Sequence, residues 1–306
     1  MRVLGIESTA HTLGIGIFDN GIKANVWDTF EGPYLPRDLA EHHAQVFPQV
    51  LEKALKEAGL SFKDIDRIAV AKGPGIGAPL SFGVAMANYL ASKHQKEIVG
   101  VNHGWAHIKI VEYVNNIETD MALYVSGGNT QIIRMKPLKV VGETLDMGIG
   151  NMLDKAAREL GLKNAAELEA LALQHKDYIP LPYTVKGMHT TFAGIFTHFK
   201  RIKDKHPPED LAYSLMHTSY AMLLETLARA MFAYKAKKIV VCGGVAQSKI
   251  LKTMLQEFQE FYDVEIYFAP NEYNRDNGAM IAYAGSLLAP QQLPIIPDPY
   301  FRVDKS

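Results

Sequence analysis

The stretch Val101-Asn102-His103-Gly104-Trp105-Ala106-His107-Ile108 decides the fold, because a strand ends here and a helix begins. Residues 96–101, rich in Ile and Val, predict the strand. In the helix that follows, His103 and His107 lie on one face, with Cβ atoms roughly 6 Å apart. Two imidazoles at this spacing can bind one metal ion, at a place where α/β proteins carry their chemistry. A solvated helix face gives the same spacing, so the metal interpretation depends on the rest of the chain.

The composition is that of a globular protein large enough for two lobes. The chain has 306 residues, 48% of them hydrophobic and 21% charged, so each lobe can bury its own core. The formal net charge of −1 argues against a protein that coats nucleic acid by bulk attraction. Any contact with nucleic acid would need a local basic patch or a partner subunit.

The cysteine content and the first residues bear on the compartment. Cys242 is the one cysteine, which excludes an internal disulfide and fits a reducing compartment. Glu7 stands where a secretory signal peptide needs an apolar run. No window approaches the roughly 18 apolar residues of a membrane span. We therefore expect a soluble, cytoplasmic protein without membrane contact.

The first half of the chain alternates between strand and helix patterns. Three strands joined by short polar turns come first, and Asp19-Asn20-Gly21 is typical of a hairpin turn. A helix closed by Gly59 follows, then a buried strand, a glycine-rich turn and a second helix. The expected elements are strands at 2–7, 13–18, 22–30 and 67–71, helices at 38–58 and 79–94, and the glycine-rich turn at 72–77.

The second half repeats this order. The expected strands are 121–126, 130–135, 138–143, 238–242 and 264–268, and the expected helices are 150–160, 208–235, 247–261 and 277–288. Between 160 and 206 the pattern is helical but less regular, and the proline-rich segment 290–306 is expected to lie over the surface. Both halves run β-β-β-α-β-α, which indicates a duplicated unit.

A duplicated β-β-β-α-β-α unit resembles the two-lobed α/β fold of actin-like ATPases, Hsp70 and sugar kinases, the ASKHA fold. The expected domains are an N-terminal lobe at 1–118, a C-terminal lobe at 119–288 with a helical insertion near 160–206, and a tail at 289–306. Such lobes hold a nucleotide between them, where backbone N–H groups of glycine turns receive the phosphates. The candidate turns are Ser126–Thr130 and Cys242–Ala246.

Five ordered motifs carry a closer resemblance. They are Gly5-Ile6-Glu7-Ser8-Thr9-Ala10-His11-Thr12, Gly73-Pro74-Gly75, His103-x-x-Ala106-His107, Tyr124-Val125-Ser126-Gly127-Gly128-Asn129-Thr130-Gln131 and Asp276-Asn277-Gly278-Ala279-Met280-Ile281-Ala282. This set resembles the universal tRNA threonylcarbamoyladenosine transferase family, also called Gcp, TsaD or OSGEP. The segments 10–12 and 142–146 are similar to its archaeal and eukaryotic branch, which works inside the KEOPS complex.

The resemblance implies one divalent metal ion. His103 and His107 match the family's paired histidine ligands. Tyr124 matches a ligand through its phenolate oxygen, and Asp276 matches the acidic ligand. Imidazoles with oxygen donors suit iron or zinc, and the residues alone do not choose between them. Without the family, Asp276 would be interpreted as a helix N-cap and Tyr124 as a core aromatic residue.

The resemblance also implies an adenine nucleotide, threonylcarbamoyl-AMP, with ATP as a further candidate. The residues that match the family's substrate contacts are Tyr124, Val125, Ser126, Gly127, Gly128, Asn129, Asp154, Glu169, Gly243, Gly244 and Ser248. Asp154 would accept hydrogen bonds from ribose hydroxyls, although it also fits a solvated helix face. Three positions depart from the family, which has a glycine at Ala165, an asparagine at Ser248 and often an arginine at Ser81 or Phe82. We expect the changes at Ala165 and Ser248 to loosen the hold on the nucleotide.

The implied activity is transfer of the threonylcarbamoyl group from threonylcarbamoyl-AMP to N6 of the adenosine adjacent to the anticodon, in tRNAs that read codons starting with A. An aryl amine is a poor nucleophile, so a metal that binds the threonylcarbamoyl oxygens would orient the donor and stabilise developing charge. Glu7 would face the cleft as a polar organiser or proton acceptor, and His11 is a second catalytic candidate. The pair His42-His43 is a weaker one, since histidines at the start of a helix are usually solvated.

The implied partners are tRNA and the other KEOPS subunits. These are a small kinase-like ATPase, a small dimerising subunit that docks on helices of the first lobe, and an accessory subunit. Residues 200–205 form a modest basic patch that fits a solvated loop equally well. We therefore expect the isolated chain to bind tRNA poorly.

Three other functions are consistent with parts of the sequence. A zinc metallopeptidase would use the histidine pair, but its motif has a glutamate directly after the first histidine, where Gly104 stands. A sugar kinase needs a catalytic aspartate that faces a sugar pocket, and the sequence offers no clear candidate. A metal- and nucleotide-binding scaffold without transferase activity is the non-enzyme alternative, suggested by Ala165 and Ser248. Activity on tRNA separates the scaffold from the enzyme.

Overall fold

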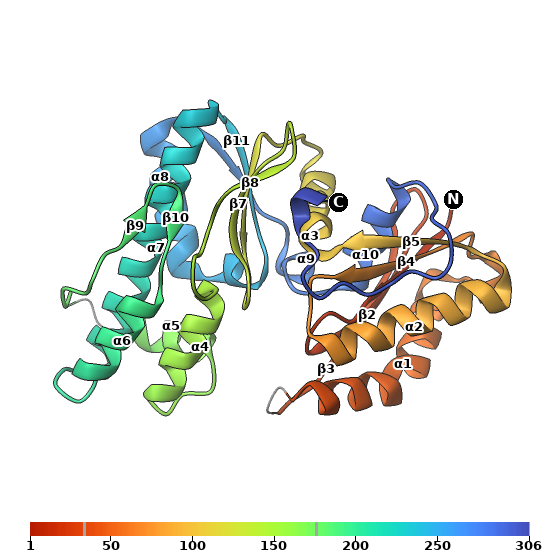
Figure 1. Ribbon diagram of the computed structural model, residues 1–306, viewed down its shortest axis with the longest axis horizontal. Coiled ribbons are helices and arrows are strands. Elements are labelled where there is room, and N and C mark those ends of the chain that lie inside the picture. The colour runs from red at the N-terminus through yellow and green to blue at the C-terminus, as the bar shows by residue number, and fades with distance from the viewer. Residues whose placement is uncertain (33–34, 175–176, 306) are drawn as a thin grey trace. The chain divides into compact units, whose positions relative to one another are not determined.

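The computed structural model describes residues 1–32, 35–174 and 177–305. Its contacts divide the chain into two compact units. Unit 1 contains Met1–Val114 and Arg275–Ser306, and unit 2 contains Asn115–Asn274. Each unit has a five-stranded sheet with helices against it (Figure 1). The predicted α/β class is confirmed.

The sheet of unit 1 has the strand order β3-β2-β1-β4-β5. Its strands are β1 (Val3–Glu7), β2 (Thr12–Phe18), β3 (Ile22–Thr29), β4 (Arg67–Gly73) and β5 (Glu97–Asn102). The pairs β1–β2 and β2–β3 are antiparallel, whereas β1–β4 and β4–β5 are parallel. The helices are α1 (Pro36–Ala58), α2 (Gly77–His94), α3 (His103–Asn115) and α10 (Gly278–Ser286), with 3₁₀ turns at Phe62–Asp64 and Val303–Lys305.

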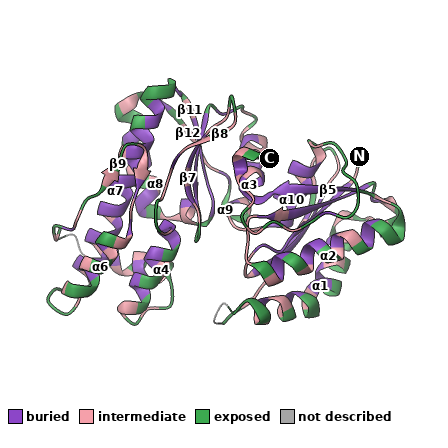
Figure 2. Cartoon of the chain, viewed as in Figure 1, coloured by how far each residue is buried: buried purple, intermediate pink, exposed green. Residues whose placement is uncertain are grey.

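Alternating glycine and isoleucine give this sheet two different faces. Successive side chains of a strand point to opposite faces. Ile15 and Ile17 of β2 are fully buried in one core with Phe47 of α1 and Leu80 of α2. The outward sides of α1 and α2 are exposed, as Figure 2 shows. The glycines of β1 and β2 lie on the other face, where a helix backbone can come close.

That glycine face is covered by α10. A Cβ added at Gly5 would lie 2.2 Å from the backbone N of Ala282, and one added at Gly16 would lie 2.2 Å from the backbone N of Ala279. The helix therefore rests directly on the strands. The order of elements along the chain assigned this helix to the C-terminal lobe at 119–288, whereas the contacts group it with unit 1.

The sheet of unit 2 has the order β12-β11-β6-β7-β8. Its strands are β6 (Met121–Val125), β7 (Thr130–Arg134), β8 (Lys139–Glu143), β11 (Lys238–Cys242) and β12 (Glu265–Tyr267). The pairs β6–β7 and β7–β8 are antiparallel, and the pairs β6–β11 and β11–β12 are parallel. Counted from the first strand of each unit, strand order and direction are the same in both units. The predicted duplication is confirmed.

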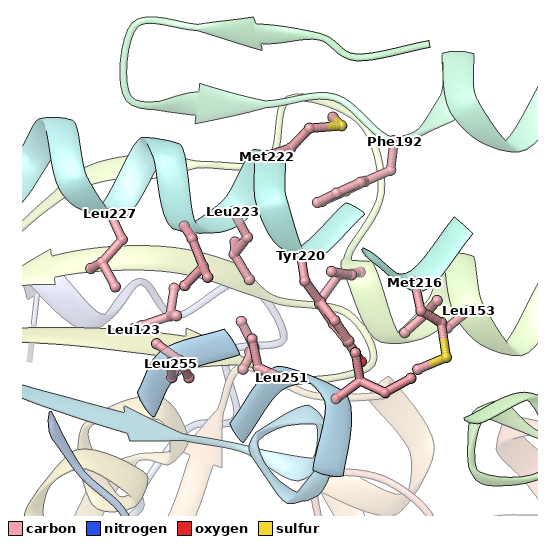
Figure 3. Packing of buried hydrophobic residues seen from close by; sticks show 14 of the residues in the cluster. Leu123, Leu153, Phe192, Met216, Tyr220, Met222, Leu223, Leu227, Leu251 and Leu255 are labelled. Carbon is pink, nitrogen blue, oxygen red and sulfur yellow. The ribbon is translucent and has the colours of Figure 1, made fainter. Parts of the chain in front are cut away.

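The helices of unit 2 bury a large apolar core. They are α4 (Ile149–Glu159), α5 (Ala165–Ala172), α6 (Ala193–Ile202), α7 (Pro208–Tyr234), α8 (Lys249–Tyr262) and α9 (Asn271–Asn274), with a 3₁₀ turn at Gly244–Gln247. Leu223 and Leu227 of α7 pack in one cluster with Leu123 of β6 and Leu255 of α8 (Figure 3). Burying each such side chain stabilises the fold by about 1.5–3 kcal/mol. In the described part of the chain, no helix has the length and apolar character needed to cross a bilayer.

The insertion near 160–206 is helical only in part. It contains α5 and α6, but also a two-stranded antiparallel ribbon of β9 (Val185–Lys186) and β10 (His189–Thr190), which the sequence pattern did not predict. Each ribbon strand has only two residues, too few for a periodicity signal. Asn164 caps α5 by accepting hydrogen bonds from the backbone N–H groups of Ala166 and Glu167. Residues 175–176 of this insertion lie outside the described residues.

The segment after α10 is anchored to unit 1. The backbone N–H of Gln291 donates to the carbonyl of Ile98 at 2.8 Å, beside the edge strand β5. Ile295 and Val303 are buried. The expectation that this segment lies over the surface is correct for its exposed residues, such as Tyr300, but its apolar residues belong to the core.

One histidine of the pair in α1 is buried, so the expectation of a solvated pair is wrong for it. His43 has no exposed surface and lies on the buried stripe of the helix with Leu39 and Phe47, four residues to either side. Its Nε2 donates to the carbonyl of Ala10 at 3.1 Å, and its Nδ1 lies 3.2 Å from Nδ1 of His42. Burial, together with the charge of His42, lowers the pKa of His43 to about 4.

This buried histidine predicts a pH-dependent stability. A pKa of about 4 in the folded chain and 6.5 in the unfolded chain means that the unfolded chain binds more protons between these values. Stability contributed by the neutral imidazole is therefore present above pH 6.5 and is lost as the pH falls toward 4. Between pH 7.5 and pH 5 the wild type should lose about 2 kcal/mol more unfolding free energy than His43→Gln.

Urea unfolding followed by tryptophan fluorescence measures this loss, because Trp27 and Trp105 both lie in unit 1. His94→Gln is the matched control, since His94 is exposed in the same unit, and it should behave like the wild type. An equal loss in wild type and His43→Gln would show that His43 does not cause it.

Candidate metal centre and nucleotide-binding turns

The histidine helix begins directly at the end of β5. Asn102, the last residue of that strand, caps α3, because its Oδ1 accepts a hydrogen bond from the backbone N–H of Trp105 at 3.0 Å. His103 and His107 occupy successive turns, with ring centroids 4.7 Å apart. Their side chains are 7% and 1% exposed. The two imidazoles therefore lie on one buried face of α3, as their spacing predicts.

Asp276 reaches this face from the other end of the sequence of unit 1. Its Oδ1 is 3.4 Å from Nε2 of His103 and 3.3 Å from Nε2 of His107. Ligand atoms of the three residues all lie within 4.8 Å of one another. The expected N-cap role belongs to Asn277, whose side chain accepts from the N–H of Met280 at 2.9 Å. Asp276 is therefore not the cap, and its carboxylate faces the histidines.

Glu7 holds His103 from behind. It is fully buried at the end of β1, and its Oε2 lies 2.8 Å from Nδ1 of His103. Its Oε1 accepts hydrogen bonds from the backbone N–H and the hydroxyl of Thr9, at 2.7 and 2.5 Å. A carboxylate at Nδ1 keeps the proton on that nitrogen and leaves the lone pair on Nε2. These contacts are those of a polar organiser, whereas the role of proton acceptor stays a prediction.

Burial and charge act in opposite directions on this cluster. Burial raises the pKa of the Asp276 carboxyl, but the charges and hydrogen bonds of His103 and His107 outweigh it and hold that pKa well below its usual range. For His107, burial lowers the pKa and outweighs the raising effect of Asp276. Near pH 7 the carboxylate is ionised and His107 is neutral. These are the protonation states that a metal cation requires.

The donor set fits one divalent metal ion. Iron and zinc both accept two imidazole nitrogens with a carboxylate oxygen, so these donors do not choose between them. Tyr124, the fourth ligand expected from the sequence, is a buried residue of unit 2, and its coordination stays a prediction. His11 is not among the described residues whose ligand atoms converge, and its backbone carbonyl accepts from the N–H of Phe30.

Two glycine turns of unit 2 follow neighbouring parallel strands. Tyr124 of β6 is paired with Cys242 of β11, so the carboxyl ends of the two strands meet at one edge of the sheet. The turn after β6 is closed by Ser126, whose N–H donates to the carbonyl of Asn129 at 2.8 Å. Its hydroxyl accepts from the N–H of Asn129 at 3.1 Å. The two turns therefore begin side by side at this edge. They are formed by Val125, Ser126, Gly127, Gly128 and Asn129 at the end of β6 and by Gly243 and Gly244 after β11.

Close backbone contacts explain why these turns contain glycine. Gly243 has φ of 95°, and a Cβ there would lie 2.3 Å from the carbonyl oxygen of Val125. A Cβ at Gly150, in the first turn of α4, would lie 2.7 Å from the carbonyl oxygen of Ser126. Around Gly128 and Gly244 the space is open. Open backbone at such turns lets phosphate oxygens approach N–H groups.

Three further residues expected to contact substrate make structural hydrogen bonds nearby. Asp154 accepts from the backbone N–H of Ala165 at 2.8 Å. Glu169 accepts from the hydroxyl of Ser248 at 2.5 Å and from the N–H of Ile250 at 3.0 Å. Ser248 is also the N-cap of α8. These bonds join α4, α5 and α8 beside the glycine turns, and contact of these residues with a ligand stays a prediction.

Two residues that support the metal centre, Thr9 and Asn102, were not predicted from the sequence. Thr9 was quoted in a motif without a role, yet it donates two hydrogen bonds to Glu7. Asn102 stood between the expected strand at 96–101 and the helix without a role, yet it caps the histidine helix. A threonine two residues after a buried carboxylate, and an asparagine directly before a helix, are both recognisable signals.

Solved structures show which fold the chain has. HypF from Thermococcus kodakarensis matches with a TM-score of 0.70 and 15% identity, covering 93% of this chain and 47% of that chain. Component A of (R)-2-hydroxyglutaryl-CoA dehydratase from Acidaminococcus fermentans matches with a TM-score of 0.60 and 15% identity, covering 93% and 96%. Identities this low show the fold alone. The chain is an actin-like, ASKHA-type α/β protein whose unit 1 carries a His/His/Asp group able to hold a metal ion.

Sequence comparison then gives the family. The model of TsaD, tRNA N6-adenosine threonylcarbamoyltransferase, matches residues 23–283. The protein of that name from Nanoarchaeum equitans is 44% identical over 312 residues, 99% of each chain. The one from Thermococcus kodakarensis is 44% identical over 295 residues, 93% of this chain and 90% of its own. The chain belongs to the tRNA N6-adenosine threonylcarbamoyltransferase family.

Removing one imidazole should deplete the metal. His107→Ala and His103→Ala should each weaken metal binding by at least the roughly 10- to 100-fold that follows loss of a second-shell partner. Elemental analysis of the purified proteins measures metal per chain, and circular dichroism checks the fold. His206→Ala, at an exposed histidine of unit 2, is the control and should keep its metal. A full equivalent of metal in both variants would contradict the assigned site.

Proposed function

We propose that this chain transfers the threonylcarbamoyl group from threonylcarbamoyl-AMP to N6 of the adenosine next to the anticodon, in tRNAs that read codons starting with A. One observation carries the proposal, namely the convergence of His103, His107 and Asp276 in a chain of this family. The cluster is assembled from residues far apart in sequence, with a buried carboxylate behind it.

The reaction needs an activated donor, because the lone pair of the adenine amine is delocalised into the ring. A bound iron or zinc ion would supply Lewis-acid stabilisation of charge on the threonylcarbamoyl oxygens. AMP leaves as the carbonyl is attacked, so the nucleotide and the metal must serve one reaction. We therefore propose Tyr124 of unit 2 as an additional metal ligand.

The chain's own residues prepare the site in three ways. Glu7 keeps the proton on Nδ1 of His103, which leaves Nε2 available. Thr9 fixes the carboxylate of Glu7 through two hydrogen bonds, so the imidazole is oriented before substrate binds. Burial keeps His107 neutral. Glu7 and His11 stay our candidates for accepting the proton that the amine loses.

For the nucleotide we propose the glycine turns of unit 2. The N–H groups of Ser126–Asn129 and Gly243–Gly244 would receive phosphate oxygens at the carboxyl ends of β6 and β11. Asp154 would meet the ribose, and Glu169 and Ser248 would border the adenine. The hydroxyl of Ser248 already donates to Glu169, which supports our expectation that it offers the base less than an asparagine would.

We also propose that the chain acts with partners, as the catalytic subunit of a KEOPS-type complex in the cytoplasm. Its net charge is −1. In the basic segment 200–205, Lys200 and Lys203 both pair with Glu159, at 2.9 and 2.8 Å, which removes part of the local positive charge. Affinity for the phosphate backbone scales with the charges that are available. Companion subunits, including a kinase-like ATPase and a dimerising subunit, would supply the remaining contacts to tRNA.

A transfer assay tests the proposal directly. Purified protein with its partner subunits, tRNA and threonylcarbamoyl-AMP should yield threonylcarbamoyladenosine, detected by mass spectrometry of the digested tRNA. His107→Ala should lower the rate by about 100-fold or more, as loss of a group central to charge stabilisation does. His206→Ala should not change it. Wild-type protein that binds metal and nucleotide but forms no product would favour the scaffold alternative.

A second measurement isolates the nucleotide turns. In Gly243→Ala, the methyl group would lie 2.3 Å from the carbonyl oxygen of Val125 at a φ of 95°, so the turn must shift. We expect AMP affinity, measured by calorimetry, to fall about tenfold, the equivalent of about 1.4 kcal/mol. Gly194→Ala is the control, because a Cβ there meets open space in the same unit. Unchanged affinity in a folded Gly243→Ala protein would move the nucleotide away from this turn.

A further inference from the structure

The segment after α10, residues 290–305, passes over the carboxyl ends of β4 and β5. The backbone N–H of Asp298 donates to the carbonyl of Lys72 at 2.7 Å. A Cβ at Gly73 would lie 1.7 Å from the carbonyl oxygen of Asp298, so the tail backbone rests directly on the last residue of β4. The ammonium group of Lys72 lies 4.3 Å from the ring centroid of Phe301. The tail is therefore in contact with the edge of the sheet that carries the metal cluster.

One tail carbonyl accepts a hydrogen bond from the residue that caps the histidine helix. The side chain of Asn102 is 1% exposed and makes two hydrogen bonds in opposite roles. Its Oδ1 accepts from the N–H of Trp105, which caps α3, and its Nδ2 donates to the carbonyl of Phe301 at 3.0 Å. His103 is the next residue in the chain. The carbonyl of Phe301 therefore holds the side-chain amide of Asn102 in place, and this amide in turn caps the first turn of the histidine helix.

A second tail carbonyl supports the residues behind His103. The N–H of Gly75 donates to the carbonyl of Pro299 at 3.2 Å. The next residue, Ile76, donates its N–H to the carbonyl of Thr9 at 2.7 Å. Thr9 in turn donates to Glu7, which holds Nδ1 of His103. Two tail carbonyls thus reach His103 by separate routes, through the N-cap and through the carboxylate.

We propose that residues 298–301 are positioning elements of the metal centre, which lock the first turn of α3 through Asn102 and the Glu7–Thr9 pair through the turn after β4. This rests on the metal site of the proposed function. None of the described tail residues belongs to the His103, His107 and Asp276 group. The tail acts by restricting the rotamer and the helix register from which the imidazoles present Nε2. Partners that orient metal ligands contribute to affinity in this way.

A double-mutant cycle tests this against a merely stabilising role. Asn102→Ser keeps an oxygen that caps α3 but is too short to reach the carbonyl of Phe301. Truncation after Pro297 removes the carbonyl itself. The probe is Co²⁺, whose visible absorption reports the geometry of its ligands and whose affinity follows from titration against a chelator. Ile296→Ala is the control for altering the tail, because that side chain is 67% exposed and outside 298–301.

We expect Asn102→Ser to weaken Co²⁺ binding about tenfold, and the truncation to weaken it at least as much because it also removes the carbonyl of Pro299. Both variants should alter the absorption bands of the bound ion. Combined, they should weaken it no further than the truncation alone, because the truncation already removes the carbonyl of Phe301 to which Asn102 donates. Ile296→Ala should bind like the wild type. Wild-type affinity and absorption in either variant would overturn the proposal, and so would a combined variant that binds Co²⁺ about tenfold more weakly than the truncation alone.

Two controls keep this result interpretable. Unfolding of the metal-free proteins, followed by the fluorescence of Trp27 and Trp105, shows whether the variants fold. If the truncated chain does not fold, Asn102→Ser alone decides, and wild-type Co²⁺ affinity in that variant refutes the proposal. Failure of the wild type to bind Co²⁺ would remove the metal centre itself, an outcome distinct from variants that bind as tightly as the wild type.

Discussion

The close contact of α10 with the glycine face of β1 and β2 is the constraint on which the metal centre depends. At Gly5 and Gly16 only glycine lets the helix backbone come this close, because a Cβ at either position would lie 2.2 Å from a backbone nitrogen of α10. Asp276 lies just before this helix, so docking of α10 carries its carboxylate to the two histidines. A bulkier residue on either surface would lift the helix and separate the ligands. Packing of backbone on backbone therefore sets the geometry of a site whose ligands, such as His107 and Asp276, lie about 170 residues apart in the sequence.

The fold and the histidine pair could be predicted from the sequence, because their signals are local. Period-2 strands and the spacing of His103 and His107 are local patterns, and the elements they predict are present. No local pattern shows which unit α10 joins, because this depends on the glycine face against which the helix packs. Burial of His43 was also missed, because a histidine near the start of a helix was expected to be solvated, although Leu39 and Phe47 lie four residues to either side on the same stripe. Thr9 and Asn102 each act through two specific hydrogen bonds, which leave no periodic signal.

Because the unit is duplicated, equivalent edges of the two sheets carry residues of different chemistry. In unit 1 the carboxyl ends of β1 and β5 bear Glu7 and Asn102, and the metal ligands follow. In unit 2 the ends of β6 and β11 bear glycine turns instead. Parallel strands that share an edge bring residues from distant parts of the sequence together without loops of special length. The same topology can therefore hold imidazoles in one copy and open backbone N–H groups in the other.

The charges of the metal centre explain why a cation other than the proton suits it. Glu7 and Asp276 bring two carboxylates into a cluster where burial is costly for unpaired charge. Protonated imidazoles could balance them, but burial disfavours the charged form of His107. Glu7 already uses the Nδ1 proton of His103. A divalent ion bound at the two Nε2 atoms and Asp276 would neutralise the carboxylates while both imidazoles stay neutral. The charge balance of the cluster therefore favours a metal ion. The hydrogen bonds of Glu7 and Thr9 keep the ligand atom of His103 in place to bind it.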